Sequence, residues 1–178
     1  MTSAEKVIEL AKETGFDAAV RLDAKTVVLR DEVRAMCAEG KCKAYGRNWT
    51  CPPACGDLDY CRSVVAGYKE GVIVQTIGHL EDSMDYETMM DTSARHKENF
   101  MKLAEKVRER YPEALCLGAG GCTVCEKCNY PEPCRFPKKA FSSMEAYGML
   151  VSEVCKANDV PYYYGENTIA FVGCFLIE

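Results

Sequence analysis

The sequence predicts an α/β or α+β fold, with a mixed β-sheet, flanking helices and two long cysteine-rich, metal-binding loops. Amphipathic stretches with helical spacing alternate along the chain with short apolar runs bounded by glycine, the pattern of helices packed on a sheet. Cysteine, glycine and proline gather instead in two segments, residues 37–61 and 118–137. We expect residues 1–178 to form a single metal-binding domain, because this length supports a substantial core.

The N-terminal part predicts a helix, a strand and an ambiguous segment. A helix over 2–14 begins with a capping box formed by Thr2 and Glu5 and ends at a glycine. Residues 16–22 favour a strand. Residues 26–36 begin like a strand, after which Asp31 is placed to cap a short helix.

The middle of the chain predicts two helices and two strands. A helix is expected over 57–68, followed by a buried strand over 71–78. The longest helix is expected over 84–110, and Pro112 stops it. Residues 114–117 favour a further strand.

The C-terminal part predicts a helix and a hairpin. Ser142 and Glu145 form a second capping box, which starts a helix that continues to about Val154. Residues 162–164 and 168–177 favour two strands of a hairpin, joined by a turn that contains glycine and asparagine.

Composition and charge exclude several classes of protein. Hydrophobic residues make up 48% of the chain and charged residues 28%, which is typical of a globular protein and not of a disordered one. The net charge of −5 gives no general attraction to nucleic acid or anionic membranes. The longest apolar run is too short to cross a bilayer, and the N-terminus lacks an apolar signal core. We therefore expect a cytoplasmic protein that binds neither nucleic acid nor membranes, with no oligomeric state implied.

The 12 cysteines favour metal binding over disulfides, because a reducing cytosol keeps thiols free. In the second loop, Cys122, Cys125 and Cys128 have the Cys-x2-Cys-x2-Cys spacing that lets one tight loop bind three irons of a cubane cluster. Cys134 is the candidate fourth ligand, although bacterial-type ferredoxins place this cysteine three residues on rather than five. Zinc is the alternative, but three cysteines in such a run make awkward zinc ligands.

The first loop supplies Cys37, Cys42, Cys51 and Cys55 as candidate ligands. Their spacing alone allows either a second cluster or zinc. Cys61 is an alternative to one of the four, or a small buried hydrophobe.

Other residues near the first loop bear on the choice of metal. The cations Arg34, Lys41, Lys43 and Arg47 outnumber Glu39 there and would favour an anionic four-thiolate cluster. The aromatic residues Tyr45 and Trp49 either shield that cluster from water or pack structurally.

The remaining cysteines and the histidines have plainer interpretations. Cys116, Cys155 and Cys174 lie on predicted strands or on an apolar helix face, so we expect buried core thiols. His96 lies among charged residues and is expected to be solvated, and its distance from His79 excludes a His-x3-His zinc pair.

Four motifs resemble a family of small prokaryotic proteins described mainly as predicted metal-binding. The motifs are Cys42-x2-Tyr45-Gly46-x2-Trp49-x-Cys51-Pro52-Pro53, Gly121-Cys122-x2-Cys125-x2-Cys128, Cys134-Arg135-x-Pro137 and Ser143-Met144-Glu145-Ala146-x-Gly148. The similarity runs from about Arg34 to the C-terminus. The resemblance implies a metal, chiefly iron–sulfur, in bacteria and archaea with anaerobic metabolism, and it implies no particular reaction.

The leading hypothesis is an iron–sulfur protein with one or two [4Fe-4S] clusters that transfers electrons to a partner redox enzyme. The irregular position of Cys134 motivates an alternative, an enzyme whose cluster leaves one iron open to a small substrate. A third hypothesis is a binding module in which zinc only holds the loops.

Overall fold

The structure is a computed structural model that describes residues 1–39 and 42–177. Its helices and strands follow one another along the chain as α1 (Ser3–Thr14), β1 (Ala18–Asp23), the 3-10 helix η1 (Ala24–Thr26), α2 (Asp31–Ala38), α3 (Leu58–Val65), β2 (Glu70–His79), α4 (Tyr86–Arg110), β3 (Leu115–Leu117), α5 (Val151–Ala157) and β4 (Thr168–Leu176).

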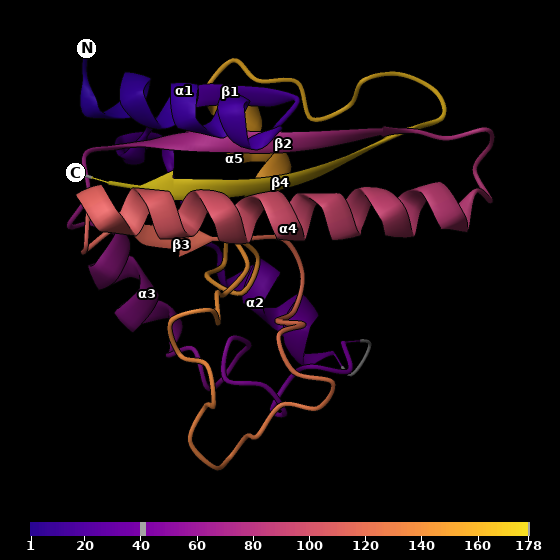
Figure 1. Ribbon diagram of the computed structural model, residues 1–178. Coiled ribbons are helices and arrows are strands. Elements are labelled where there is room, and N and C mark those ends of the chain that lie inside the picture. The colour runs from indigo at the N-terminus through magenta and orange to yellow at the C-terminus, as the bar shows by residue number, and fades with distance from the viewer. Residues whose placement is uncertain (40–41, 178) are drawn as a thin grey trace.

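The four strands form one sheet in the order β1-β2-β4-β3 (Figure 1). The long strands β2 and β4 pair at the centre, from Gly71 opposite Leu176 to His79 opposite Thr168. The α+β alternative is thereby confirmed. All three pairings between these strands are antiparallel, where the sequence predicted a mixed sheet.

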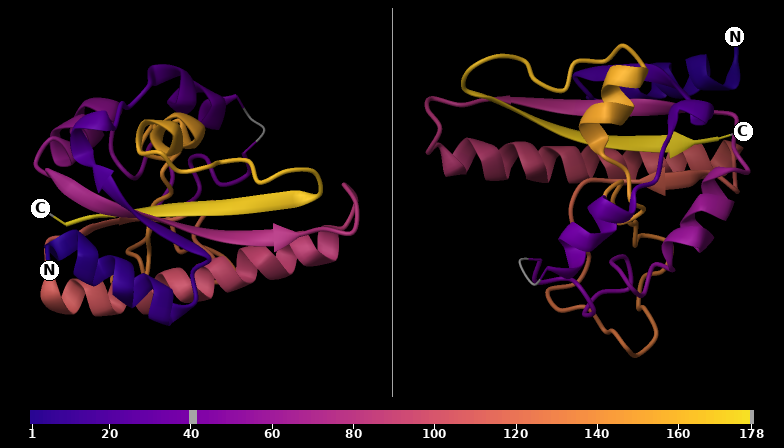
Figure 2. Two further views of the ribbon diagram at one scale, coloured as in Figure 1. Left: turned by 90° about the horizontal axis from the view of Figure 1, so that it is seen from above. Right: turned by 180° about the vertical axis from the view of Figure 1, so that it is seen from behind.

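Helices cover both faces of the sheet, with α1 and α4 on one face and α5 and α3 on the other (Figure 2). Alternate residues of β2 divide between the two cores, as the period of a strand requires. Val72 and Val74 pack with α1 and α4, whereas Ile73 packs with α3 and α5. Phe175 and Cys174 of β4 divide in the same way.

The first helix forms as its sequence predicts. Thr2 accepts a hydrogen bond from the Glu5 amide, and the Glu5 carboxylate accepts one from the Thr2 amide, which completes the capping box. Gly15 ends the helix with a φ of 105°, a left-handed conformation that favours glycine.

The ambiguous segment after β1 resolves mainly as helix. The stretch that resembles a strand, from Thr26 to Leu29, forms none: Thr26 is the last residue of η1, and Leu29 makes only a single bridge to Met149. Asp31 is the first residue of α2 and does not cap it, since Arg30 occupies the capping position.

The helix predicted from Ser142 is wrong in its first two turns. The Ser143 hydroxyl, not that of Ser142, accepts a hydrogen bond from the Ala146 amide. This single turn then ends at Gly148, whose φ of 87° breaks the helical path, and α5 begins only at Val151.

The terminal hairpin is also wrong. Strand β4 forms and pairs with β2 along its length, whereas the Pro161 carbonyl accepts a hydrogen bond from the buried side chain of Gln75 and the segment after it does not pair with β4. Those residues form no strand, and the Tyr164 hydroxyl instead donates a 2.5 Å hydrogen bond to the buried side chain of Gln75.

Two irregular segments, residues 42–57 and 118–142, project together from the edge of the sheet at β3 (Figure 1). We call this pair of segments the cysteine lobe. Cys37, near the end of α2, precedes its first segment. None of the helices in the described chain combines the length and the apolar character needed to cross a membrane.

Candidate metal centre

The two segments of the cysteine lobe are joined through Trp49. Its indole nitrogen donates a 2.7 Å hydrogen bond to the Glu132 carbonyl, and its ring meets Tyr130 edge-on at 5.1 Å. The Asn48 side chain shapes the backbone next to it by accepting hydrogen bonds from the amide and hydroxyl of Thr50. Trp49 belongs to the first loop in sequence but covers cysteines of the second.

The second cysteine group lines one cavity together with Trp49. Its thiols are Cys122, Cys125, Cys128 and Cys134, and all four are partly exposed. The Val124 amide donates a hydrogen bond to the Cys122 sulfur, although burial and the other three thiols raise the pKa of Cys122. The cluster motif and the more distant Cys134 thus share one space.

The end of this loop is fixed by its own polar side chains. Arg135 donates a 3.0 Å hydrogen bond to the Asn129 side chain, which in turn donates one to the Pro133 carbonyl. These contacts stabilise the segment of five residues that separates Cys128 from Cys134.

Three thiols of the first cysteine group line a second cavity of about 170 Å³. They are Cys37, Cys42 and Cys51, and Tyr45 lies at the same cavity. Burial raises the pKa of Cys37 and of Cys51, and neighbouring thiols raise each of them further. Because several thiolates repel one another at close range, a bound cation would be needed to hold all three ionised.

Glu145 also lies at this cavity, although the sequence pattern indicated only a capping role for it. Part of its side chain reaches solvent, but desolvation of the carboxyl group raises the pKa of Glu145. The signal in the sequence is its place in the motif Ser143-Met144-Glu145-Ala146-x-Gly148, for which the resemblance implies no ligand.

Cys55 does not line that cavity and lies against Cys61 instead, with a hydrogen bond between the two thiols. Arg34 donates a 3.6 Å hydrogen bond to the Cys61 sulfur and shorter ones to the carbonyls of Gly56 and Ala146. The hydrogen bond from Cys55, assisted by this guanidinium, lowers the pKa of Cys61.

The cations expected around the first loop differ in their contacts and in their exposure to solvent. Arg34 makes the contacts described above, whereas Lys43 and Arg47 are exposed. Lys41 lies outside the described residues.

The three cysteines expected in the core are there. Cys116, Cys155 and Cys174 are buried, and burial raises the pKa of each, to about 11 for Cys116 and Cys155. Cys61 is fully buried as well.

The prediction for His96 was wrong, because this residue is fully buried. It lies on the face of α4 that also carries Phe100 and Leu103, one and two turns later, and that face packs on the sheet. The charged neighbours of His96 in sequence lie on other faces of the helix. Its Nδ1 lies 2.9 Å from the Thr76 hydroxyl, whereas its Nε2 has no partner within the described part of the chain.

The cavity of the first cysteine group is large for a single ion, whereas that of the second has a volume of about 20 Å³. Among the described residues, no three or more His, Cys, Asp or Glu side chains converge as ligands of one metal ion. A single zinc draws its thiolates to about 2.3 Å, whereas a cubane cluster holds them apart around a larger core. The cavity that Cys37, Cys42 and Cys51 line, at about 170 Å³, has several times the roughly 30 Å³ that one water molecule takes up in the liquid.

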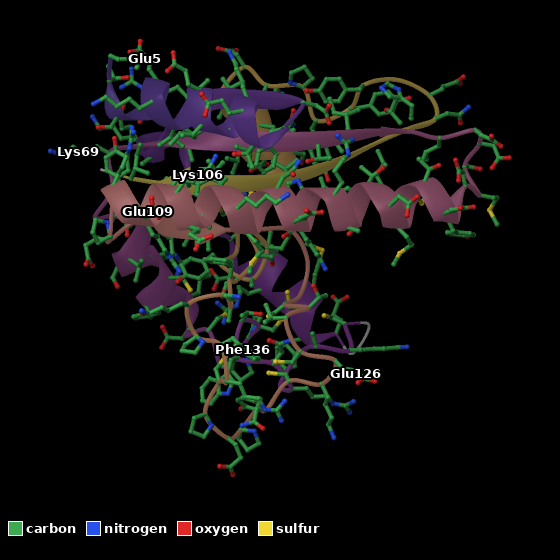
Figure 3. All side chains as sticks on the ribbon, viewed as in Figure 1. Glu5, Lys69, Lys106, Glu109, Glu126 and Phe136 are labelled. Carbon is green, nitrogen blue, oxygen red and sulfur yellow. The ribbon has the colours of Figure 1, made fainter. Side chains whose placement is uncertain are left out.

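Sulfur atoms gather in the cysteine lobe below α4, in the region between Phe136 and Glu126 (Figure 3). The two groups are close enough that the Cys122 thiol raises the pKa of Cys51.

Neither a curated protein nor a solved structure gives a significant match to this chain. One family model does match, over residues 20–177, which begins before the region from Arg34 onward that the sequence motifs covered. The chain therefore belongs to the family described as "Predicted metal-binding protein (DUF2284)".

Proposed function

We propose that this metal-binding protein is an iron–sulfur protein that carries electrons to and from a partner redox enzyme in the cytoplasm. The observation that carries the proposal is the arrangement of thiols in the lobe. Four thiols line one cavity and three line another, and both cavities are formed by irregular loops next to a rigid sheet. Thiolates in groups of three or four are the ligands of cubane clusters.

The second loop would hold one [4Fe-4S] cluster through Cys122, Cys125, Cys128 and Cys134. The amide of Val124 already donates to the Cys122 sulfur, and hydrogen bonds of this kind raise the reduction potential of a cluster. Trp49 covers the same cavity and would limit the access of water. The cluster would supply one-electron chemistry, and these residues would set its potential.

The first loop would hold a second cluster through Cys37, Cys42 and Cys51. The sequence offered Cys55 as the fourth ligand, but Cys55 lies against Cys61, and the carboxyl group of Glu145 lies at the cavity. We therefore propose Glu145 for the fourth position. In this assignment the Cys55–Cys61 pair is structural, and Arg34 holds it in place.

A second candidate function follows from the same cavity. An iron held by three thiolates and one exchangeable carboxylate can release the carboxylate and bind a small substrate as a Lewis acid. The partial exposure of Glu145 favours this open-iron enzyme at the first site rather than at Cys134, where the sequence suggested it.

Four single variants, purified without oxygen, test the assignment. Cys125→Ser and Cys51→Ser should each remove about four irons per chain, from the second and the first site respectively. Glu145→Gln should leave three thiolates and one iron without a carboxylate ligand, and one-electron oxidation by added ferricyanide should release this iron as Fe²⁺ and give a three-iron cluster, which electron paramagnetic resonance detects.

Cys55→Ser is the matched control, because it removes a thiol from the same loop. We expect its iron content and cluster spectrum to equal those of the parent protein. Loss of about four irons from Cys55→Ser would instead restore Cys55 as the fourth ligand. Unchanged iron in both Cys51→Ser and Cys125→Ser would contradict the proposal as a whole.

A further inference from the structure

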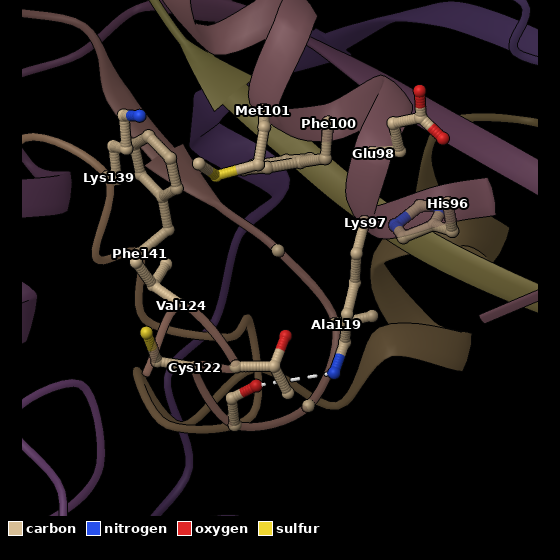
Figure 4. Close-up of a pocket in the computed structure, with 14 residues that line it drawn as sticks. His96, Lys97, Glu98, Phe100, Met101, Ala119, Cys122, Val124, Lys139 and Phe141 are labelled. Atoms are coloured by element: carbon tan, nitrogen blue, oxygen red, sulfur yellow. Dashed lines mark hydrogen bonds between the residues drawn. The ribbon is translucent and has the colours of Figure 1, made fainter. Parts of the chain in front are cut away.

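A larger cavity, of about 330 Å³, lies between helix α4 and the residues that connect β3 to the cysteine lobe (Figure 4). Its volume is at the lower end of the range for pockets that bind small molecules. One wall is the backbone of residues 118–121, and Cys122 closes the end next to the second cysteine group. No function considered so far uses this space.

The walls of the cavity are mainly apolar, with Phe100, Met101, Val124 and Phe141 among the lining residues. The rings are held in place by their neighbours. Phe141 meets Phe100 edge-on at 5.5 Å and carries the Arg108 guanidinium on its face at 4.6 Å. Phe100 also stacks on the buried ring of Phe175. The cavity is therefore preformed and does not need a ligand to shape it.

Positive charge lies on two sides of the cavity. Lys97 and Lys139 are both lining residues, and Figure 4 shows them on different sides of the space. Lys97 donates only one long hydrogen bond, 3.4 Å, to the Gly121 carbonyl. Glu98 is the one carboxylate among the lining residues described, and it is already paired with Lys102 at 2.6 Å.

We propose that this cavity binds a small organic anion with a flat, apolar body. The body would lie against Phe100, Val124 and Phe141, and the anionic group would lie beside Lys97, with Lys139 adding positive charge from the other side of the cavity (Figure 4). The apolar walls and the positive charge of the two lysines are complementary to such a molecule. A neutral apolar molecule would leave the charge unused, and a small inorganic anion would leave most of the apolar surface uncovered.

The cavity would also serve the proposed function, and this second part of the inference rests on that function. Cys122 lines both this cavity and the cavity of the second cysteine group. A molecule bound here would lie beside a cluster held by Cys122, within reach of electron transfer. Binding itself needs only the fold and remains testable whatever metal the lobe carries.

Calorimetric titration of the whole, anaerobically purified protein with two matched probes tests the proposal. The probes are 2-naphthoate, an anion, and 2-naphthalenemethanol, a neutral molecule of the same shape. We expect naphthoate to bind saturably at one site per chain, at least about tenfold tighter than the alcohol. Lys97→Gln combined with Lys139→Gln should weaken naphthoate about tenfold and the alcohol less than twofold.

Two further sets of variants separate this site from other binding. Lys106→Gln combined with Lys138→Gln removes the same charge from residues that do not line the cavity, and should leave both affinities unchanged. Ala119→Phe should fill the cavity and abolish binding of both probes, and Val124→Phe serves the same purpose if the first variant does not fold.

Three results would overturn the inference: no saturable binding of naphthoate, equal affinity for the two probes, or unchanged binding in a folded variant with a filled cavity. The iron and sulfide content of the same sample decides the proposed function separately. Tight naphthoate binding to protein that carries no iron would keep the anion site and reject the cluster.

Discussion

The indole of Trp49 and the carbonyl of Glu132 form a 2.7 Å hydrogen bond across 83 residues of sequence. This contact joins the two cysteine-bearing segments, because Trp49 comes from the first and Glu132 from the second. It places a side chain of one cysteine motif over the thiols of the other. The two motifs therefore form a common structure rather than two independent loops.

Replacing Trp49 by phenylalanine should loosen the lobe without unfolding the sheet. The variant keeps a ring against Tyr130 but loses the hydrogen bond to Glu132, a loss of about 1 kcal/mol. Hydrogen exchange should become faster for amides in residues 42–57 and 118–142 and stay unchanged in β2 and β4. Equal acceleration in the sheet would show that the lobe and the sheet unfold as one unit.

Trp49 is the only tryptophan in the chain, so its fluorescence reports on the lobe alone. We expect removal of metal by a chelator to shift its emission to longer wavelength, since the loops lose the centre that orders them. Far-UV circular dichroism should change little, because α1 and α4 are held by the apolar core. A large loss of helix signal on chelation would mean that metal also supports the sheet.

Sequence patterns predicted the parts of this fold that depend on local chemistry. The capping box of Thr2 and Glu5 satisfies backbone groups within one helical turn, so a few residues determine it. The helix predicted over 57–68 forms as α3, and Asp57 is its N-cap. Pro112 follows the end of α4 by two residues, as a proline that cannot continue a helix should.

The predictions that were wrong concern features that depend on contacts with residues far away in the sequence. Residues 162–164 look like a strand, but the distant side chain of Gln75 binds the Pro161 carbonyl and the Tyr164 hydroxyl, and these residues form no strand. His96 looks solvated from its neighbours in sequence, yet the face of α4 that meets the sheet includes it.

In the candidate site, spacing predicted eight thiols in two groups. It could not predict that Cys55 turns toward Cys61, or that Glu145 reaches the cavity from a segment about 90 residues later.

His96 makes the stability of the protein depend on pH. Burial lowers the pKa of His96 from 6.5 to about 4, so the unfolded chain binds a proton that the folded chain does not. Stability attributable to His96 is thus complete above pH 6.5 and decreases as the pH falls toward 4. A depression of this size corresponds to roughly 3 kcal/mol.

The double variant His96→Phe/Thr76→Val tests this dependence. It removes the titrating ring together with the hydroxyl that would otherwise lose its partner at 2.9 Å. Urea unfolding between pH 7 and pH 4 should show a smaller decrease in the free energy of unfolding for the variant than for the parent protein. Equal decreases would mean that His96 has the same pKa in the folded and the unfolded state.

Arg34 should contribute much more to stability than Arg30. Its guanidinium donates to the carbonyls of Gly56 and Ala146 at 2.7 and 3.1 Å and to the Cys61 sulfur. Arg34→Met leaves these acceptors without their donor and should cost roughly 2 kcal/mol.

The matched control is Arg30→Met, which breaks a 2.6 Å ion pair with Glu153 whose side chains are 40% and 50% exposed. Exposed pairs contribute at most about 1 kcal/mol, so its melting temperature should change little. Comparable losses in the two variants, measured by thermal unfolding, would argue against the role of Arg34 as the anchor of this region.

The most direct test of the account is the amount of iron, zinc and acid-labile sulfide per chain in protein purified without oxygen. Two cubane clusters predict about eight iron and about eight sulfide, with a brown colour that dithionite bleaches. About one or two zinc ions with no sulfide, in a colourless protein, would contradict the iron–sulfur assignment and leave the metal a structural role.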